Sequence, residues 1–127
     1  RRGGAEVEIV TLPGQASLAG GREGLSDVLE KTSGAVDLLF CSSDLIAQGV
    51  LVEARARGLK SPEDVAVIGF GDQDFAASLD LPLTTVRVDR VKMGKIGAHE
   101  ILARMNAETG LSKIFDIGFE IVERSSA

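Results

Sequence analysis

The sequence has few of the residues on which metal, redox or stacking chemistry depends. Among 127 residues it has one cysteine, one histidine and neither tryptophan nor tyrosine. A single cysteine excludes an internal disulfide framework and a zinc site built from several cysteines. The single histidine, His99, leaves little material for acid–base catalysis. We therefore expect that the protein is not an enzyme, has no catalytic residue and binds neither a metal nor a cofactor.

Clustered positive charge and long apolar runs are also missing. Fourteen basic residues against nineteen acidic ones give a net charge of −5, whereas a nucleic-acid surface needs clustered positive charge. No apolar run approaches the roughly 20 residues that a membrane-spanning helix requires. The chain by itself therefore predicts neither a DNA-binding surface nor a membrane partner.

The residues that are present have the pattern of an α/β domain. Hydrophobic residues make up 44% and charged residues 26%, which is ordinary for a folded domain. Apolar periodicity predicts strands over residues 7–12, 35–41, 65–70, 84–88 and 117–122, and helices over 18–29, 45–57 and 91–105. Ser17 and Asp44 are placed to cap the first two helices, and Gly58 to end the second.

The order of these elements predicts a parallel sheet flanked by helices. The nearly continuous apolar runs at 35–41 and 65–70 are typical of strands buried on both faces. Strands that alternate with helices indicate right-handed crossovers. The polar end at 125–127 predicts a frayed terminus. The start at Arg1, without methionine, leads us to expect an internal point of a longer chain.

Polar loops follow three of the predicted elements. They lie at residues 15–17, 42–44 and 71–74, and ligands of open parallel sheets bind beyond the carboxyl ends of the strands. Their hydroxyl, amide and carboxylate groups suit a polyhydroxylated small molecule. Solvated turns and helix caps are the plainer alternative. Since Asp44 has the pattern of a cap, Ser43 is the better candidate for a ligand contact.

A second hypothesis concerns Asp72 and Asp74, which follow the strand at 65–70. Paired carboxylates in that place could hold magnesium for phosphoryl transfer. Such a phosphohydrolase also requires a positioned lysine. The available lysines, Lys92 and Lys95, lie on a predicted helix far along the chain from these aspartates. Because turn aspartates are common, this is the weaker hypothesis.

Four segments together resemble the LacI/GalR (lactose-repressor) family of bacterial transcription regulators. The segments are residues 40–49, 58–70, 82–86 and 93–94. Their order and spacing agree with the family from about Val7 to Arg124. The most specific parts are the Pro-Glu-Asp-Val-Ala-Val-Ile-Gly-Phe and Leu-Thr-Thr-Val segments.

The resemblance implies the C-terminal portion of a two-lobed, periplasmic-binding-protein-like (type I) domain. Residues 1–83 and 111–127 would form part of the C-terminal lobe, and residues 84–110 part of the N-terminal lobe. A helix-turn-helix domain that binds operator DNA would lie outside this chain. The implied function is a cytoplasmic repressor that senses a sugar or sugar acid between its lobes, allosterically coupled to operator binding. A periplasmic sugar-binding protein of a transporter shares the architecture and stays open as an alternative.

The resemblance also implies ligand-binding positions. Ser43 falls where many members have an asparagine that binds the effector. Gly71 falls where many have an aspartate that binds sugar hydroxyls, with Asp72 adjacent. Ala16 and Arg90 fall at or near positions where members have ligand-lining aromatic residues. The loss of a carboxylate and an aromatic ring, with Arg90 present, favours a sugar acid such as gluconate over a neutral sugar.

A homodimer is implied as well. The helix at 44–57 and the region around Leu79 fall where the family pairs its C-terminal lobes. That helix carries a second apolar stripe, which a single core contact would not require; it comprises Leu45, Gly49, Val52 and Ala56.

Overall fold

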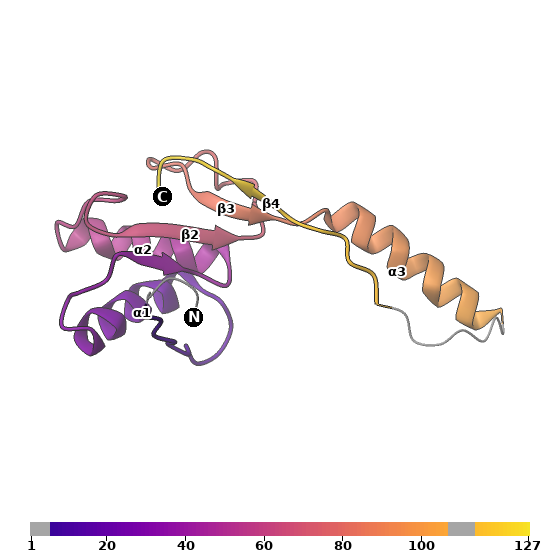
Figure 1. Cartoon of the computed structure of the whole chain (residues 1–127), viewed down its shortest axis with the longest axis horizontal. Helices are drawn as coiled ribbons and strands as arrows, with labels where there is room; N and C mark the ends of the chain where they lie inside the picture. The colour runs from indigo at the N-terminus through magenta and orange to yellow at the C-terminus, as the bar shows by residue number, and fades with distance from the viewer. Residues whose placement is uncertain (1–5, 107–113) are drawn as a thin grey trace.

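The computed structural model describes residues 6–106 and 114–127. In chain order the elements are α1 (Leu18–Lys31), β1 (Leu38–Phe40), α2 (Asp44–Ala56), β2 (Ala66–Phe70), β3 (Thr84–Arg87), α3 (Arg90–Met105) and β4 (Glu120–Val122). The four strands form one sheet in the order β1-β2-β3-β4 (Figure 1). This confirms the predicted α/β class.

The sheet is parallel only in part. β1 pairs with β2, and β2 with β3, in parallel. β4 runs antiparallel to β3, with Arg87 opposite Glu120. The chain leaves the sheet after β3, forms α3 and re-enters at the end where it left (Figure 1). The last strand must therefore run against its neighbour, which corrects the expectation of an entirely parallel sheet.

The strand predicted over residues 7–12 does not form. These residues have no regular secondary structure, and Val7 and Ile9 are 70% and 80% exposed. The segment instead approaches α1, where the Leu12 side chain lies against Gly20 and Gly24. Its apolar residues resemble a strand, but a strand needs a neighbour for its backbone groups, and here the segment pairs with none of β1–β4.

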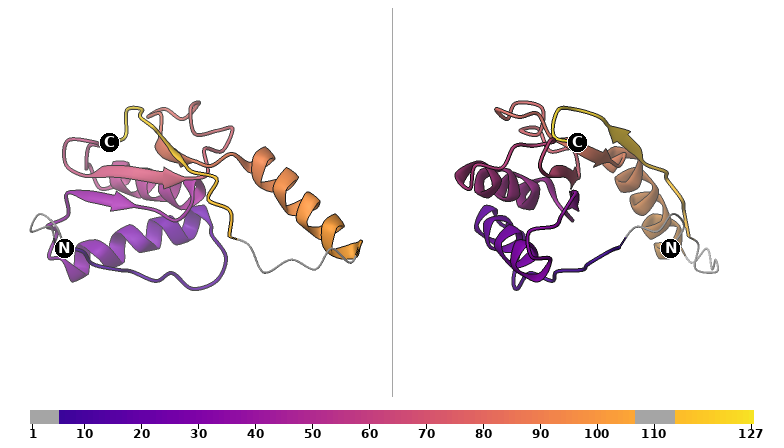
Figure 2. Two further views of the ribbon diagram at one scale, coloured as in Figure 1. Left: turned by 45° about the vertical axis from the view of Figure 1, so that its right-hand side comes forward. Right: turned by 60° about the vertical axis from the view of Figure 1, so that its left-hand side comes forward.

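Both α1 and α2 cover the same face of the sheet (Figures 1 and 2). Their core contacts centre on Leu25, Val50, Val67 and Leu83, all almost fully buried. On the opposite face Phe40 is 61% exposed, and Leu38 and Phe70 are 50% and 40% exposed. The prediction that both faces are buried is therefore wrong for the described residues, which cover only one.

Serines cap both helices of this layer. The Ser17 hydroxyl accepts a hydrogen bond from Gly20 N at 2.9 Å, as predicted. The Ser43 hydroxyl accepts one from Ile46 N at 3.2 Å. The prediction that Asp44 caps α2 is therefore wrong by one residue. Asp44 is the first residue of the helix, and its side chain is directed into the interior, with no exposed surface.

α3 stands apart from the rest of the fold. It extends away from the sheet (Figure 1) and has no buried residue. Its apolar side chains Val91, Ile101 and Met105 are 68%, 61% and 75% exposed. Among the residues described, no helix has the length and apolar character needed to cross a membrane.

The C-terminus is anchored, which corrects the expectation of a frayed end. Ser126 is fully buried. Its hydroxyl donates to Val67 O at 2.6 Å and accepts from Thr84 N at 2.8 Å. The Ser126 carbonyl also accepts from Val67 N at 2.7 Å. The tail thus joins β2 to β3 at the ends opposite the polar loops.

We expect Ser126→Ala to lower the free energy of unfolding by about 1–3 kcal/mol, because it leaves the Thr84 amide and the Val67 carbonyl without their hydroxyl partner. Urea denaturation followed by circular dichroism measures the loss. Ser125→Ala, on an exposed neighbour, is the matched control and should change stability by less than about 0.5 kcal/mol. Equal effects of the two changes would contradict the anchoring role.

Candidate ligand pocket

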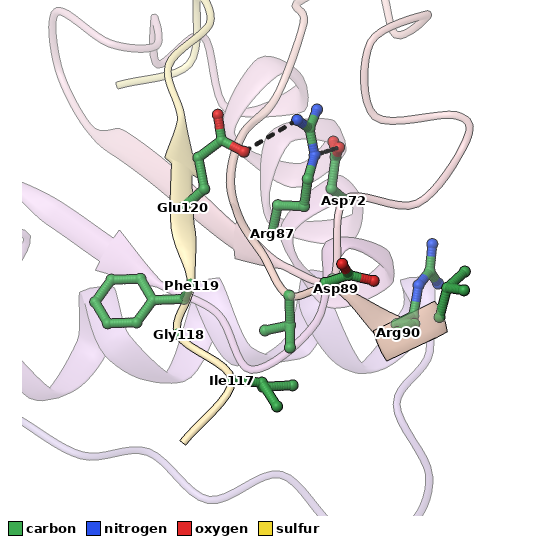
Figure 3. A pocket seen from close by; sticks show the side chains of 11 residues that line it. Asp72, Arg87, Asp89, Arg90, Ile117, Gly118, Phe119 and Glu120 are labelled. Atoms are coloured by element: carbon green, nitrogen blue, oxygen red, sulfur yellow. Dashed lines mark hydrogen bonds and ion pairs between the residues drawn. The ribbon is translucent and has the colours of Figure 1, made fainter. Parts of the chain in front are cut away.

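A pocket of about 540 Å³ lies where the chain enters and leaves the sheet on its way to α3. Three segments line it: residues 71–72 after β2, residues 87–91 from β3 into α3, and residues 117–120 leading into β4. Figure 3 shows their side chains. The pocket therefore lies at the carboxyl ends of two parallel strands, where open sheets bind ligands.

Asp72 lines this pocket in an unusual backbone conformation. Its φ is +47°, and that of Gly71 before it is +121°. The first value is tolerated by aspartate, and the second is a region that only glycine adopts readily. This double turn directs the Asp72 carboxylate back toward β3 and the C-terminal segment.

Two arginines bind the Asp72 carboxylate. Arg87 donates from Nε to Oδ2 at 2.7 Å, and Arg124 donates from a terminal nitrogen to Oδ1 at 2.8 Å. The Asp72 and Arg124 side chains are only 13% and 15% exposed, whereas Arg87 is 46% exposed. Asp72 thus joins a largely buried arginine, Arg124, to one that lines the pocket, Arg87.

These contacts set the ionisation of Asp72. Burial by itself would raise the pKa of its carboxyl group, but the hydrogen bonds from Arg124 and Arg87 lower it more, and the net pKa is lowered. Because the pKa of Asp72 is lower in the folded state, its ionised carboxylate stabilises the fold at pH values above the pKa of aspartate in the unfolded chain, about 3.9. That stabilisation is lost as the pH falls through the folded value.

We therefore expect Asp72→Asn to make the free energy of unfolding less dependent on pH in the acidic range. Asparagine tolerates the positive φ, so the change mainly removes charge. The difference in free energy of unfolding between wild type and variant should be constant above about pH 5 and shrink as the pH falls below about 4. Urea titrations from pH 3 to 7 measure it. A difference that does not vary with pH would contradict the assigned pKa shift.

A second carboxylate, Asp44, fastens the loop beside the pocket. The Thr85 hydroxyl donates to Oδ1 at 2.5 Å, and the backbone N–H of Gln73 donates to Oδ2 at 2.6 Å. Asp44 thus connects the start of α2, strand β3 and the 71–74 loop. Position 69 of β2 has room only for glycine, because a Cβ there would collide with the Asp44 carboxylate.

The structure brings together three of the five predicted site residues. Gly71, Asp72 and Arg90 line the pocket. Ser43 is half-buried as the N-cap of α2, and Ala16 is exposed in the segment before α1. Neither Ser43 nor Ala16 lines the pocket.

Arg87 and Glu120 also line the pocket, and the sequence did not indicate them as ligand-binding residues. From the sequence, both positions are only members of predicted strands, Arg87 at 84–88 and Glu120 at 117–122. Only the register, which places Arg87 opposite Glu120, shows that they meet. The pairing of strands so far apart in sequence carries no local signal.

The geometry speaks against the magnesium hypothesis. Both carboxylate oxygens of Asp72 accept hydrogen bonds from arginines, and a magnesium ion would need those oxygens. Asp74 is exposed. Within the described ranges, no group of three or more histidine, cysteine or acidic residues could hold a metal ion.

Cys41 is buried at the end of β1, and burial raises the pKa of its thiol to about 12. It therefore packs as a small apolar residue, and its raised pKa disfavours the thiolate that a nucleophile requires.

Fold and pocket together define an α/β ligand-binding domain whose pocket lies at the carboxyl edge of the sheet. A family model described as the periplasmic binding protein-like domain matches residues 5–127. The chain belongs to this family.

Similar proteins are transcription regulators. The HTH-type transcriptional regulator GntR of Escherichia coli is 37% identical over 86 residues, which are 68% of this chain and 26% of that protein. The regulator of the same name from Pseudomonas aeruginosa is 35% identical over 120 residues, or 94% of this chain and 34% of that protein. These matches confirm the resemblance to LacI/GalR regulators.

A solved structure gives the same result. The transcriptional regulator CelR–cellobiose complex is 29% identical, with a TM-score of 0.82, over 90% of this chain and 35% of that one. The chain thus spans about a quarter to a third of the length of the relatives that it matches.

Proposed function

We propose that this chain is the effector-sensing part of a bacterial DNA-binding repressor, and that a small molecule binds in the pocket between two lobes. The observation that carries the proposal is the position of the pocket, which is lined by the strand ends leading to and from α3. A ligand bound there contacts both the sheet and the segment that leaves it. The similarity to HTH-type regulators supports the same function.

The proposed division into lobes explains the exposure of α3. The lobe boundary expected after residue 83 is moved to follow residue 87, so residues 1–87 and 111–127 belong to one lobe and the segment from 88 to 110 contributes to the other. β3 still pairs with β2, so we place the crossing just after Arg87. An amphipathic helix without any buried residue needs a companion surface for its apolar side chains, and the second lobe supplies it.

We propose a sugar acid such as gluconate as the effector. A relative by structure is complexed with a sugar, cellobiose, and polar groups of this pocket suit hydroxyls. Two arginines, Arg87 and Arg90, line the pocket together with Asp72, Asp89 and Glu120, and a guanidinium is the group of this lining that can bind a ligand carboxylate. Ser43, Gly71 and Ala16 are proposed as further contacts from neighbouring loops.

The proposed mechanism is a shift between two lobe arrangements. An effector changes their populations only to the extent that it binds one arrangement more tightly than the other. A changed lobe angle then repositions the DNA-binding domains, and operator affinity and effector affinity change by the same factor. Such a protein acts in the cytoplasm and catalyses no reaction. The regulator relatives favour this function over that of a periplasmic transport protein.

Operator binding by the intact regulator tests the proposal. DNA fragments selected by the protein from its genome are titrated in a fluorescence anisotropy assay, with and without D-gluconate. We expect gluconate to change the dissociation constant by about 5- to 150-fold, as is typical of allosteric coupling. A protein that selects no DNA would overturn the proposed function.

We also propose a homodimer through the outer face of α2 and the Leu79 region. Leu45 and Val52 of α2 are 37% and 41% exposed, whereas Gly49 of the same stripe packs against α1. Leu79 partly packs against the core, so Val52→Asp is the cleaner test. Sedimentation velocity of the intact protein should show this variant as a monomer at concentrations where wild type is dimeric. An unchanged dimer would place the interface elsewhere.

A further inference from the structure

We propose that Arg87 is the residue that selects an anionic effector, and that Glu120 holds its guanidinium in place until the carboxylate of the ligand replaces it. This inference rests on the proposed function, because it assigns charge selectivity within the same pocket. It concerns two residues that no sequence signal indicated.

The charges of the pocket residues leave Arg87 available. Asp72 already has a partner in Arg124, which is 15% exposed and binds Oδ1 at 2.8 Å. Arg124 also donates to Leu83 O at 2.8 Å, so it is committed to the interior. The negative charge of Asp72 is therefore balanced without Arg87. Arg87 shares Asp72 with Arg124, and the second carboxylate that it binds is Glu120.

The two contacts of Arg87 differ in strength. Its Nε bond to Asp72 measures 2.7 Å on a carboxylate that is 13% exposed. Its terminal nitrogen meets Glu120 at 3.2 Å, and the Glu120 side chain is 65% exposed. Exposed ion pairs contribute little to stability, so a ligand carboxylate can replace Glu120 at small cost. The bond to Asp72 meanwhile holds the guanidinium of this pocket-lining residue between Asp72 and Glu120, as Figure 3 shows.

Arg90 is less suited to this role. It is the first residue of α3, which has no buried residue, and its side chain lies apart from the Arg87–Asp72 pair (Figure 3). Arg90 moves with α3, so its place in the pocket depends on how the second lobe closes. Arg87 belongs to β3 and is positioned before any ligand arrives.

Two ligands that differ mainly in charge test the inference. D-gluconate and D-glucitol have the same hydroxylated chain, and gluconate has a carboxylate where glucitol has a CH₂OH group. Isothermal titration calorimetry of the intact regulator measures both dissociation constants. The variants are Arg87→Gln, Glu120→Gln and the control Arg22→Gln. Arg22 of α1 lies outside the pocket and donates from Nε to Glu53 of α2 at 2.9 Å. It matches Arg87 in charge, in an Nε bond to a carboxylate and in exposure, at 48% against 46%.

We expect wild type to bind gluconate at least about 10-fold more tightly than glucitol, as a charge-assisted hydrogen bond allows. Arg87→Gln should weaken gluconate binding by about 10-fold or more and leave glucitol binding within about twofold. Glu120→Gln should strengthen gluconate binding, because it removes the competing carboxylate. Arg22→Gln should bind both ligands as wild type does.

Other results overturn the inference in distinguishable ways. If wild type prefers gluconate and Arg87→Gln keeps that preference, Arg87 does not select the charge, although the proposed effector stands. If Glu120→Gln weakens gluconate binding, Glu120 is not the group that the ligand replaces. If wild type binds neither compound, the proposed sugar-acid effector fails, and this inference fails with it. Circular dichroism of each variant shows whether a lost affinity reflects unfolding.

Discussion

Replacement of Asp44 by alanine is expected to lower the free energy of unfolding by about 3–4 kcal/mol. The carboxylate is fully buried and accepts hydrogen bonds from the Thr85 hydroxyl and the Gln73 amide. Hydrogen bonds to a charged group contribute about 1.5–3 kcal/mol each, and a buried donor left without its acceptor is costly. Alanine removes both acceptors, so the loss should approach the sum of the two.

Two further variants make the Asp44 prediction specific. Asp44→Asn keeps one carbonyl oxygen and should lose less stability than alanine does, since it can still accept one of the two bonds. Asp74→Ala removes an exposed carboxylate nearby and should change stability by less than about 0.5 kcal/mol. Urea denaturation of the chain measures all three. A loss of under 1 kcal/mol for Asp44→Ala would show that Asp44 does not join α2, β3 and the 71–74 loop.

Gly49→Ala is expected to be comparably severe, at about 3 kcal/mol, the upper end for overpacking. A Cβ on Gly49 would lie 2.9 Å from the Cα of Gly21 and would collide with the Leu18 carbonyl oxygen of α1. Both are backbone atoms, which cannot move aside as the end of a flexible side chain does. The two helices must separate, and the core contacts of Leu25 and Val50 weaken with them.

Gly97→Ala is the matched control for Gly49→Ala. Both glycines lie inside helices, but a Cβ on Gly97 meets nothing within 4 Å. Alanine favours a helix over glycine by up to about 1 kcal/mol, so this change should leave stability unchanged or raise it. Thermal denaturation of both variants is the measurement. Equal destabilisation would mean that helix propensity, rather than the α1–α2 contact, explains the loss at Gly49.

Elements with a repeating apolar pattern could be predicted from the sequence. The helices at 18–31, 44–56 and 90–105 lie within a residue or two of their expected bounds, because the spacing of apolar residues and a capping serine or aspartate specify a helix locally. The strand expected at 7–12 failed, because a strand also needs a partner, and partners are chosen by the whole fold. The sequence also predicts Asp44 rather than Ser43 as the cap of α2, because either side chain can cap a helix. Only the fold shows that Asp44 instead binds the buried Thr85 hydroxyl.

The pocket could be located from the sequence only in outline. The rule that ligands bind at the carboxyl edge of parallel strands led to Gly71 and Asp72, and both line the pocket. The arginines that bind Asp72 could not be identified in this way. Arg87 and Arg124 lie 15 and 52 positions further along the chain. Arg87 meets Asp72 through the pairing of β2 with β3. Arg124 meets it only because β4 returns antiparallel to β3, which the expected parallel sheet did not include.

A crystal structure of the intact protein with D-gluconate tests most directly the claim that this chain is one half of a ligand-binding cleft. We expect gluconate in the pocket at the ends of β2 and β3, with its carboxylate on Arg87, and the apolar side chains of α3 buried against a second lobe. A structure in which α3 stays exposed to solvent and the sugar acid binds elsewhere would contradict it.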